Sequence, residues 1–496
     1  MSPRNSSLAG KMARRWGRRC RLPHLRADRK FHDIRSSVII SRSLIDLYDR
    51  YQPCQILIYG IMRWVLGVAM LAVVASVLTG QAVVSGLPPF LYTAAPRYEA
   101  AAWNHGGERF PDGAHLVLAT REGHRDAVPS FFASADAAVS YDGLHILFAG
   151  RPTRQDRWQI WRADLAGGAP QPVTTGSGAC VRPLYLPDGR VAYTRMTAAE
   201  SAIEVAPPGG GNADVLTHAP GWYLTDDVLH DGRILFEWGG ELFTVYPDGT
   251  GVESLRCDHG PQRSGGRQVS SGDVIFDVAG GLARFRTALA VQEKLPPSDV
   301  QIAGPVAEIA ADRWLVSARP RSGGAYSIHL AGPRSRVAES VESPHGLNAV
   351  EPVAVSERVP PRDFPSGLVP TRKTGNLLCL DVHESKTPID GKIHSVRLFS
   401  RNASGEPQLL GQTPVAADGS FYVEVPADRP IRMELVDAAG ARLRAEEHWF
   451  WMRPSEQRIC VGCHAGPERA PENKVPEILN QTLTPVKMLG DYGHSQ

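Results

Sequence analysis

Short runs of alternating apolar and polar residues recur along the first two thirds of the chain, each introduced by a turn containing Asp, usually beside Gly. Alternation with a period of two predicts half-buried β-strands, and Asp-Gly pairs predict tight turns. Successive turns are 30 to 46 residues apart, and the strands that follow them occupy residues 115–119, 144–148, 190–194, 233–237, 274–276 and 313–317. Repeats of this length made of short strands are typical of β-propeller blades. We therefore predict a propeller of six or seven blades over residues 95–350.

A second region with strand alternation follows a proline-rich connector at residues 351–374, which cannot form central strands. The alternation returns in five stretches, at residues 377–383, 395–400, 420–425, 432–437 and 447–452. Five short strands in so compact a region predict a small β-sandwich, which we place at residues 375–450. Residues 451–496 would form a C-terminal segment. The predicted fold class is all-β.

The N-terminal region has a different composition. Residues 1–50 carry thirteen Lys or Arg against four Asp or Glu. Removing that surplus of nine from the overall charge of +2 leaves −7 for residues 51–496, so the body of the protein is mildly acidic. A basic face that follows phosphates is therefore not expected, and nucleic acid is excluded as a partner. Residues 1–61 are interpreted as a basic extension, either disordered or upstream of the true start.

An export signal follows this extension. Met62, Arg63 and Trp64 precede an apolar run at 65–77 and small residues at 80–82, the pattern of a secretory signal peptide over 62–82. The alternative is an uncleaved membrane anchor with the arginine-rich tail in the cytoplasm. Arg63 disfavours the anchor, because a charge at membrane depth costs roughly 2.5–3.5 kcal/mol. Both interpretations predict a periplasmic or extracytoplasmic protein, with a membrane attachment only if the segment stays uncleaved.

The cysteines then indicate the chemistry. Of seven, Cys20 and Cys54 precede the export signal, and the remaining five are Cys180, Cys257, Cys379, Cys460 and Cys463. An odd number outside the cytoplasm is not the pattern of a disulfide framework. Two of the five belong to a single motif, Cys460-Val-Gly-Cys463-His464.

This motif has the spacing of a haem c attachment site. Two thiols three positions apart can add to the two vinyl groups of one haem, and the adjacent His464 can bind the iron from the same side. Chance would supply only ~0.003 such motifs in a chain with this many Cys and His. We predict one covalent haem c on Cys460 and Cys463, with His464 as the proximal ligand. A structural zinc site, a thioredoxin-like redox pair and a simple disulfide are weaker alternatives.

The second axial ligand of the iron is left open by the sequence. The candidates are His383, His394, His448, Met452, Met488 and His494. The aromatic run 449–451 between His448 and Met452 would form either one wall of the porphyrin pocket or part of the sandwich core. An open coordination position favours catalysis on a small ligand, whereas a strong His or Met ligand favours electron transfer.

Two family resemblances can now be stated. The repeats resemble the blades of periplasmic propellers of the TolB type. Gly375 to Val486 resembles the middle, haem-binding domain of the hydrazine synthase alpha subunit, through the stretches 375–385, 418–430, 449–464 and 470–476. This second resemblance implies haem attachment at Cys460 and Cys463, with His464 beside the iron. It also makes Cys379 a candidate contributor to a metal-rich site, against the alternative of a buried strand cysteine.

Two departures from that family limit the prediction of activity. Hydrazine synthase alpha carries a second haem motif and an unusual tyrosine ligand soon after the first, whereas this sequence has one motif, Glu468 in the following segment, and Tyr492 as its next tyrosine. Hydrazine synthesis is therefore not predicted. We expect a mono-haem c-type cytochrome-like protein that acts in electron transfer, or as the redox subunit of an oxidoreductase with a partner protein. The alternative is a propeller-based binding module for a partner or small molecule, with a structural or sensory haem.

Overall fold

The computed structural model describes residues 86–496 apart from 257–259, 288–289, 297–298, 338–339, 343, 345, 386, 403, 447, 463–473 and 491–496. The basic extension, the export signal, Cys257, Cys463, His464, Glu468, Tyr492 and His494 therefore lie outside the described residues. Every described residue belongs to one compact unit. Among the described residues, no helix is both long and apolar enough to span a bilayer.

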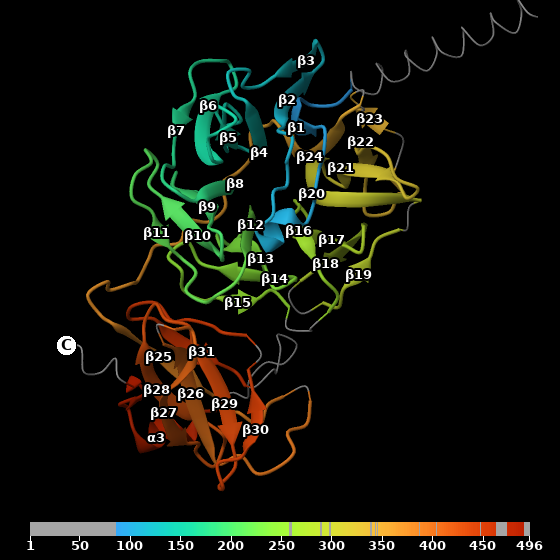
Figure 1. Cartoon of the computed structure of the whole chain (residues 1–496). Helices are drawn as coiled ribbons and strands as arrows, with labels where there is room; N and C mark the ends of the chain where they lie inside the picture. The colour runs from blue at the N-terminus through green and yellow to red at the C-terminus, as the bar shows by residue number, and fades with distance from the viewer. Residues whose placement is uncertain are drawn as a thin grey trace, which may run out of the picture. The chain divides into compact units, whose positions relative to one another are not determined.

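Six four-stranded antiparallel sheets form a ring in the described part of the chain, which confirms the β-propeller and gives it six blades (Figure 1). Five blades are continuous in sequence. The first two comprise β4 (Ala133–Val139), β5 (His145–Arg151), β6 (Gln159–Asp164) and β7 (Gln171–Pro172), then β8 (Ala179–Tyr185), β9 (Val191–Met196), β10 (Ser201–Ala206) and β11 (Asp214–Val215). The next comprises β12 (Tyr223–Val228), β13 (Ile234–Trp238), β14 (Glu241–Val245) and β15 (Glu253–Ser254). The last two comprise β16 (Ser264–Gln268), β17 (Val274–Val278), β18 (Gly281–Phe285) and β19 (Glu293–Lys294), then β20 (Val300–Ala310), β21 (Arg313–Pro320), β22 (Ser327–Ala331) and β23 (Ser340–Glu342).

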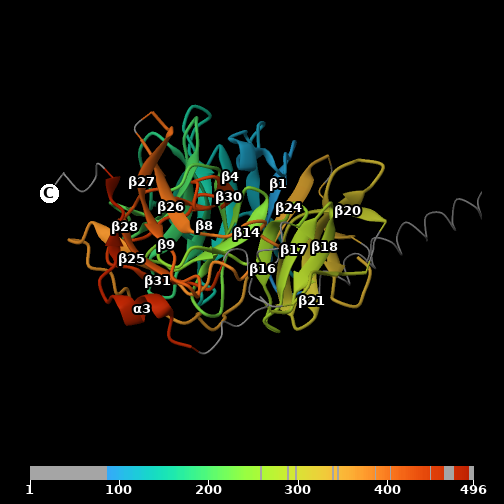
Figure 2. The same cartoon turned by 90° about the horizontal axis from the view of Figure 1, so that it is seen from below.

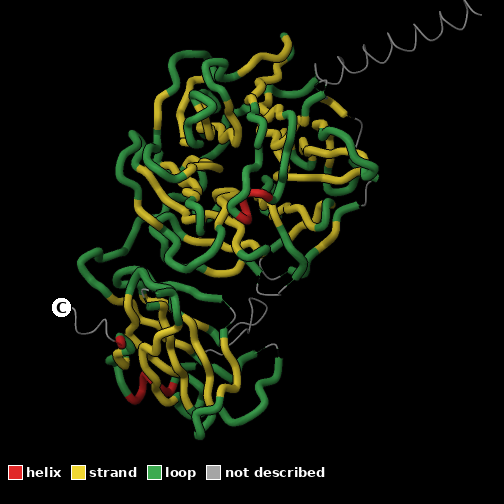
Figure 3. Tube along the Cα trace, viewed as in Figure 1, coloured by secondary structure: helices red, strands yellow, loops and turns green. Residues whose placement is uncertain are grey.

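The sixth blade closes the ring by joining both ends of the propeller sequence. Its strand order is β24 (Asn348–Ala354), β1 (Phe90–Ala95), β2 (His115–Thr120) and β3 (Gly123–Asp126). The strands thus extend beyond the predicted range 95–350 at both ends, and residues 351–354 of the predicted connector are strand. The reason is that β24 follows no Asp-Gly turn, so the repeat pattern did not mark it. A short 3-10 helix, η1 (Ala102–His105), lies in the β1–β2 insertion (Figure 3).

The predicted Asp-Gly turns join consecutive strands within the blades. Gly232 shows why glycine is needed at one of them: its φ is +91°, which side chains with a Cβ rarely adopt. A Cβ there would also lie 2.3 Å from the carbonyl oxygen of Arg362, in the connector that passes over this turn. The turn therefore fixes both the blade and the path of the connector.

The second region is a β-sandwich of two four-stranded sheets (Figure 2). One sheet has the order β31 (Gln457–Cys460), β25 (Thr374–Cys379), β28 (Phe421–Pro426) and β32 (Val486–Lys487). The other has the order β27 (Pro407–Pro414), β26 (Ser395–Arg401), β29 (Arg432–Val436) and β30 (Arg442–Ala445), and a short helix, α3, spans Glu477–Gln481. Fully buried apolar side chains fill the space between the sheets: Leu377, Val396, Leu398, Val423 and Val425.

Two details of the predicted sandwich need correction. The predicted strand at 447–452 is not a strand, and its only bridge in the described residues joins Phe450 to Ile431. The predicted C-terminal segment 451–496 instead supplies β31 and β32 to one sheet. The apolar alternation at 447–452 was misread because its aromatic side chains pack on the propeller rather than across a strand pair, as described below.

Candidate functional site

The first cysteine of the motif lies at the end of an edge strand of the sandwich. β31 pairs in parallel with β25, and this register places Cys460 directly beside Cys379. Side chains opposite each other in a parallel pair point to the same face of the sheet. Cys379 is only 2% exposed, whereas Cys460 is half-buried. The fold thus brings together two cysteines that the sequence did not link.

Both cysteines line a pocket at the edge of the sandwich. Its cavity volume is ≈ 20 Å³, and its lining is Cys379, Val382, Phe421, Met433, Leu435, Arg444, Ala445, Glu446, Cys460 and Gly462. These residues come from both sheets, so the pocket opens between them. Most of the lining is apolar and the Cys460 thiol lies at its wall, but the cavity holds about one water molecule, so a haem attached to Cys460 would lie outside it. The described half of the motif therefore fits covalent haem attachment outside the pocket.

The environment of Cys460 favours its thiolate. A hydrogen bond from Cys379 lowers the pKa of Cys460, and this effect outweighs the opposing effect of burial. The positive charge of Arg458 acts in the same direction as Cys379. Because the thiolate is the reactive form of cysteine, Cys460 is activated for bond formation.

The turn after β25 packs against the motif. A Cβ at Gly462 would lie 2.6 Å from the carbonyl oxygen of Glu384 and 2.8 Å from that of Asp381, so only glycine fits at this position. The same turn carries His383, whose Nδ1 is 2.9 Å from Asp381 Oδ1. Sequence analysis included His383 among six ligand candidates but missed Asp381. The Asp-x-His spacing is the signal that could have identified the pair.

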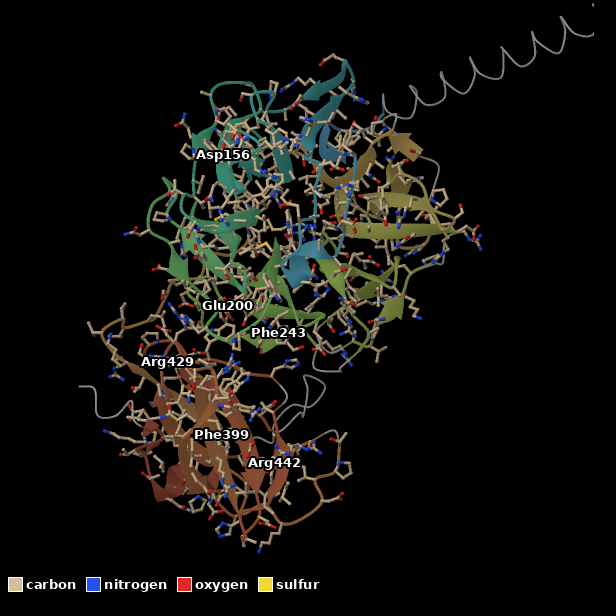
Figure 4. All side chains as sticks on the ribbon, viewed as in Figure 1. Asp156, Glu200, Phe243, Phe399, Arg429 and Arg442 are labelled. Atoms are coloured by element: carbon tan, nitrogen blue, oxygen red, sulfur yellow. The ribbon has the colours of Figure 1, made fainter. Side chains whose placement is uncertain are left out.

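The other described ligand candidates are less available. Met452 and Met488 are fully buried in the sandwich core, where their sulfur atoms are enclosed by apolar side chains. His394 places Nδ1 2.9 Å from the hydroxyl of Ser395. His448 packs on the propeller, with its ring 5.6 Å from that of Trp238. Phe243 of β14, labelled in Figure 4, is a second ring beside His448, at 6.2 Å.

The aromatic run 449–451 packs on the propeller. Trp451 is fully buried and belongs to an apolar cluster shared by the β8–β11 and β12–β15 blades. Its indole Nε1 donates a hydrogen bond to the Gly249 carbonyl oxygen at 3.2 Å, and its ring lies 6.2 Å from that of Trp238. Phe450 contacts both this cluster and the sandwich core. The run joins the motif-bearing sandwich to the propeller.

Two arginines reinforce this contact. Arg453 donates from Nε to the Asp248 carbonyl oxygen at 3.0 Å and from Nη1 to Asp428 Oδ1 at 2.8 Å. Arg458, two residues before Cys460, donates to the carbonyl oxygen of Val252. β31 is thereby fixed on the blade as well as in its own sheet, which holds Cys460 in place.

No three His, Cys, Asp or Glu side chains come together as a set of metal ligands among the residues that the structure describes. Cys379 is a buried strand cysteine with the Cys460 thiol beside it. Because Cys463 and His464 lie outside the described residues, the complete haem motif remains a prediction.

The fold and site define a propeller followed by a β-sandwich whose edge strand leads into a Cys-x-x-Cys-His motif. Residues 383–465 match the family described as hydrazine synthase alpha subunit middle domain, which confirms the resemblance seen in the sequence. A curated relative, hydrazine synthase subunit alpha of Kuenenia stuttgartiensis, is 34% identical over 61 residues, which cover 12% of this chain and 8% of that protein.

One solved structure supports the fold. Kuenenia stuttgartiensis hydrazine synthase superposes with a TM-score of 0.69 at 18% identity, over 80% of this chain and 72% of that chain. A TolB structure from Agrobacterium tumefaciens covers 52% of this chain and 89% of its own, with 15% identity and a TM-score of 0.38. At this identity, the likeness to hydrazine synthase concerns the fold, and the activity of that enzyme is not transferred with it.

Proposed function

We propose that this chain is an exported mono-haem c-type protein that transfers electrons, alone or as the redox subunit of an oxidoreductase with a partner protein. Cys460 and Cys463 would hold the haem, and His464 would bind its iron. The observation that carries the proposal is the position of Cys460, which ends an edge strand at the wall of an apolar pocket and leads directly into the motif. The export signal at 62–82 supports it, because haem c belongs to extracytoplasmic proteins.

The protein's own residues have three tasks in this function. Cys379 stabilises the thiolate of Cys460 through its hydrogen bond, which favours thioether formation. Apolar side chains such as Val382 and Phe421 keep water from the pocket. The contacts of Arg458 and Trp451 with the propeller keep the motif in one position. A bound haem c would supply one-electron redox chemistry at its iron.

We infer that His383 would bind the haem iron together with His464. Histidines that bind a metal through one ring nitrogen usually donate the other N–H to a carboxylate, which fixes the tautomer. Asp381 is placed to accept such a bond from His383 Nδ1, and this leaves Nε2 for the iron. The turn that carries both residues packs against Gly462 of the motif. Met452 and Met488 would have to leave the sandwich core to serve instead.

The spectrum of the purified protein tests both inferences. After export from a host with haem c maturation machinery, we expect a Soret band and a pyridine haemochrome spectrum of one haem per chain. Reduced wild-type protein should not bind carbon monoxide, because its iron has two protein ligands. His383→Ala should bind it promptly, whereas the control His394→Ala should behave as wild type. Colourless protein would contradict haem attachment, and a carbon monoxide response equal in wild type and His383→Ala would contradict the ligand assignment.

The role of Cys379 can be measured without haem. In protein produced without maturation machinery, Cys379→Ala should raise the pKa of Cys460, because it removes the hydrogen bond that lowers it. The pH at which Cys460 reacts with iodoacetamide at half of its maximum rate should then increase. Peptide-resolved mass spectrometry measures this rate. Cys180 is an internal control, since burial raises its pKa to about 11 and its rate should not respond. An unchanged Cys460 profile would refute the activation.

A further inference from the structure

The axis of the propeller is lined by a ring of β-bulges. Each of the six innermost strands, β4, β8, β12, β16, β20 and β24, has a register shift against its neighbour. Three of these bulges contain a charged residue with a positive φ of 54°. These residues are Asp136, Arg182 and Glu351. Such backbone conformations cost about 1–3 kcal/mol each for residues other than glycine, and they tend to occur at functional sites. The bulges direct charged groups toward the channel.

These groups form a buried ionic network. Arg182 Nη2 lies 2.6 Å from Asp226 Oδ1, and Arg109 Nη1 lies 2.6 Å from Glu351 Oε1. Asp136 Oδ2 accepts a hydrogen bond from the Arg182 backbone N–H at 3.0 Å. All five side chains are less than a tenth exposed. With the neighbouring buried Glu237, four carboxyl groups face two guanidinium groups, so the network has a deficit of positive charge.

Within the part of the chain that the structure describes, two carboxyl oxygens in this network accept no hydrogen bond from any donor group: Asp136 Oδ1 and Glu351 Oε2. Burial raises the pKa of Asp136 well above its ordinary value. Burial acts in the same direction on Glu351, but Arg109 and Arg182 outweigh it and hold the pKa of Glu351 below its ordinary value. A proton on Asp136, bridging to Glu351, therefore satisfies both oxygens when no ligand is present. This proton supplies one of the positive charges that the buried ionic network lacks.

The channel leaves room for a ligand above this pair. A pocket of ≈ 650 Å³ opens along the inner strands, within the size range of small-molecule sites. A deeper pocket, lined by Asp136 and Glu351, shares Leu184, Arg267 and Val353 with it. Apolar side chains line part of the larger pocket: Val139, Val228, Val269, Val306 and Val353, of which only Val353 also lines the deeper pocket.

Two other segments of the chain contact this region. The β1–β2 insertion, which contains the short helix η1 (Figure 3), reaches the charged network through the ion pair of Arg109 with Glu351. Arg358 of the connector lines the larger pocket with Tyr141. Its backbone N–H donates to the Tyr141 carbonyl oxygen at 2.9 Å, and its guanidinium group lies over the Tyr141 ring at 4.9 Å.

We propose that the propeller channel binds a small organic cation, a primary ammonium group on a short apolar body, with the ammonium at Asp136 and Glu351. The ammonium N–H groups donate to the two carboxyl oxygens that lack donors, and its charge balances the network. The apolar body lies along the valine-rich wall. This site is independent of the haem and goes beyond the redox function proposed above.

Calorimetry with n-butylammonium tests the proposal on the exported full-length chain. We expect binding by n-butylammonium and none by n-butanol or butyrate at the same concentration. Asp136→Asn should weaken binding at least tenfold while the protein stays folded, because the amide can donate to Glu351 without adding charge. Asp277→Asn, a half-buried carboxyl of β17, is the matched control and should bind as wild type. Binding of Ca²⁺ or Mg²⁺ but not of the amine, or equal binding in Asp136→Asn, would overturn the proposal.

The pH dependence gives a second readout. The groups that face the pair are Tyr98, Arg109, Arg182, Asp226 and Arg267. Because the ammonium replaces the proton held by Asp136, its affinity should rise about tenfold per pH unit up to the raised pKa of that group. Calorimetry in buffers of different ionisation enthalpy should show release of close to one proton per ligand. Release of none would exclude the exchange and overturn the proposed site.

Discussion

Replacing both motif cysteines, Cys460→Ser and Cys463→Ser, is expected to abolish covalent haem attachment. Serine cannot form the thioether bonds, so the exported polypeptide should have the mass of the bare chain and no haemochrome spectrum. Cys463→Ser alone should remove the second thioether and shift the haemochrome band to that of a singly attached haem. Intact-mass spectrometry and the pyridine haemochrome assay measure both effects.

Cys257→Ser is the matched control for these variants, because it removes a cysteine outside the motif from the same exported chain. It should carry one haem, as we expect of the wild type. Wild-type spectra in the double variant would show that the haem is held elsewhere. That result would remove the basis of the redox function and leave the propeller and sandwich without an assigned cofactor.

Trp451→Ala should produce the largest loss of stability among single changes in the motif-bearing region. Trp451 is fully buried in the aromatic cluster with Tyr223 and Trp238 and donates a hydrogen bond to the Gly249 carbonyl oxygen. Removing a buried tryptophan side chain leaves a cavity and typically costs about 3–5 kcal/mol. Denaturant unfolding followed by tryptophan fluorescence and far-ultraviolet circular dichroism should show this decrease in the free energy of unfolding.

Trp449→Ala is the control for Trp451→Ala, because Trp449 is only half-buried at the edge of the same cluster. It should cost distinctly less. If the two variants lose the same stability, or if Trp451→Ala changes it by less than about 0.5 kcal/mol, the ordinary scatter of surface substitutions, then Trp451 does not join the sandwich to the blade.

Local pattern alone was enough for the propeller and for the motif. Asp-Gly turns followed by alternating strands identify blades because each blade is a local unit of neighbouring strands. The spacing of Cys460, Cys463 and His464 predicts haem attachment because that chemistry needs only a short contiguous segment. The second region was likewise recognised as a sandwich from its strand alternation.

Features that depend on distant strands were decided by the tertiary structure. Ring closure through β24 set the blade count at six, and no turn in the sequence marks that strand. Cys379 and Cys460 meet only because β25 and β31 pair in parallel, a register that neither strand encodes alone. The aromatic run at 449–451 faces the propeller because apolar side chains on that surface pack against it. Strand alternation predicts that a side chain is buried, but it does not predict which other segment that side chain packs against. The sequence by itself thus predicted which residues attach the haem. Packing between remote segments decided which groups surround those residues. It therefore also decided the environment of the Cys460 thiol and the balance of charges in the propeller channel.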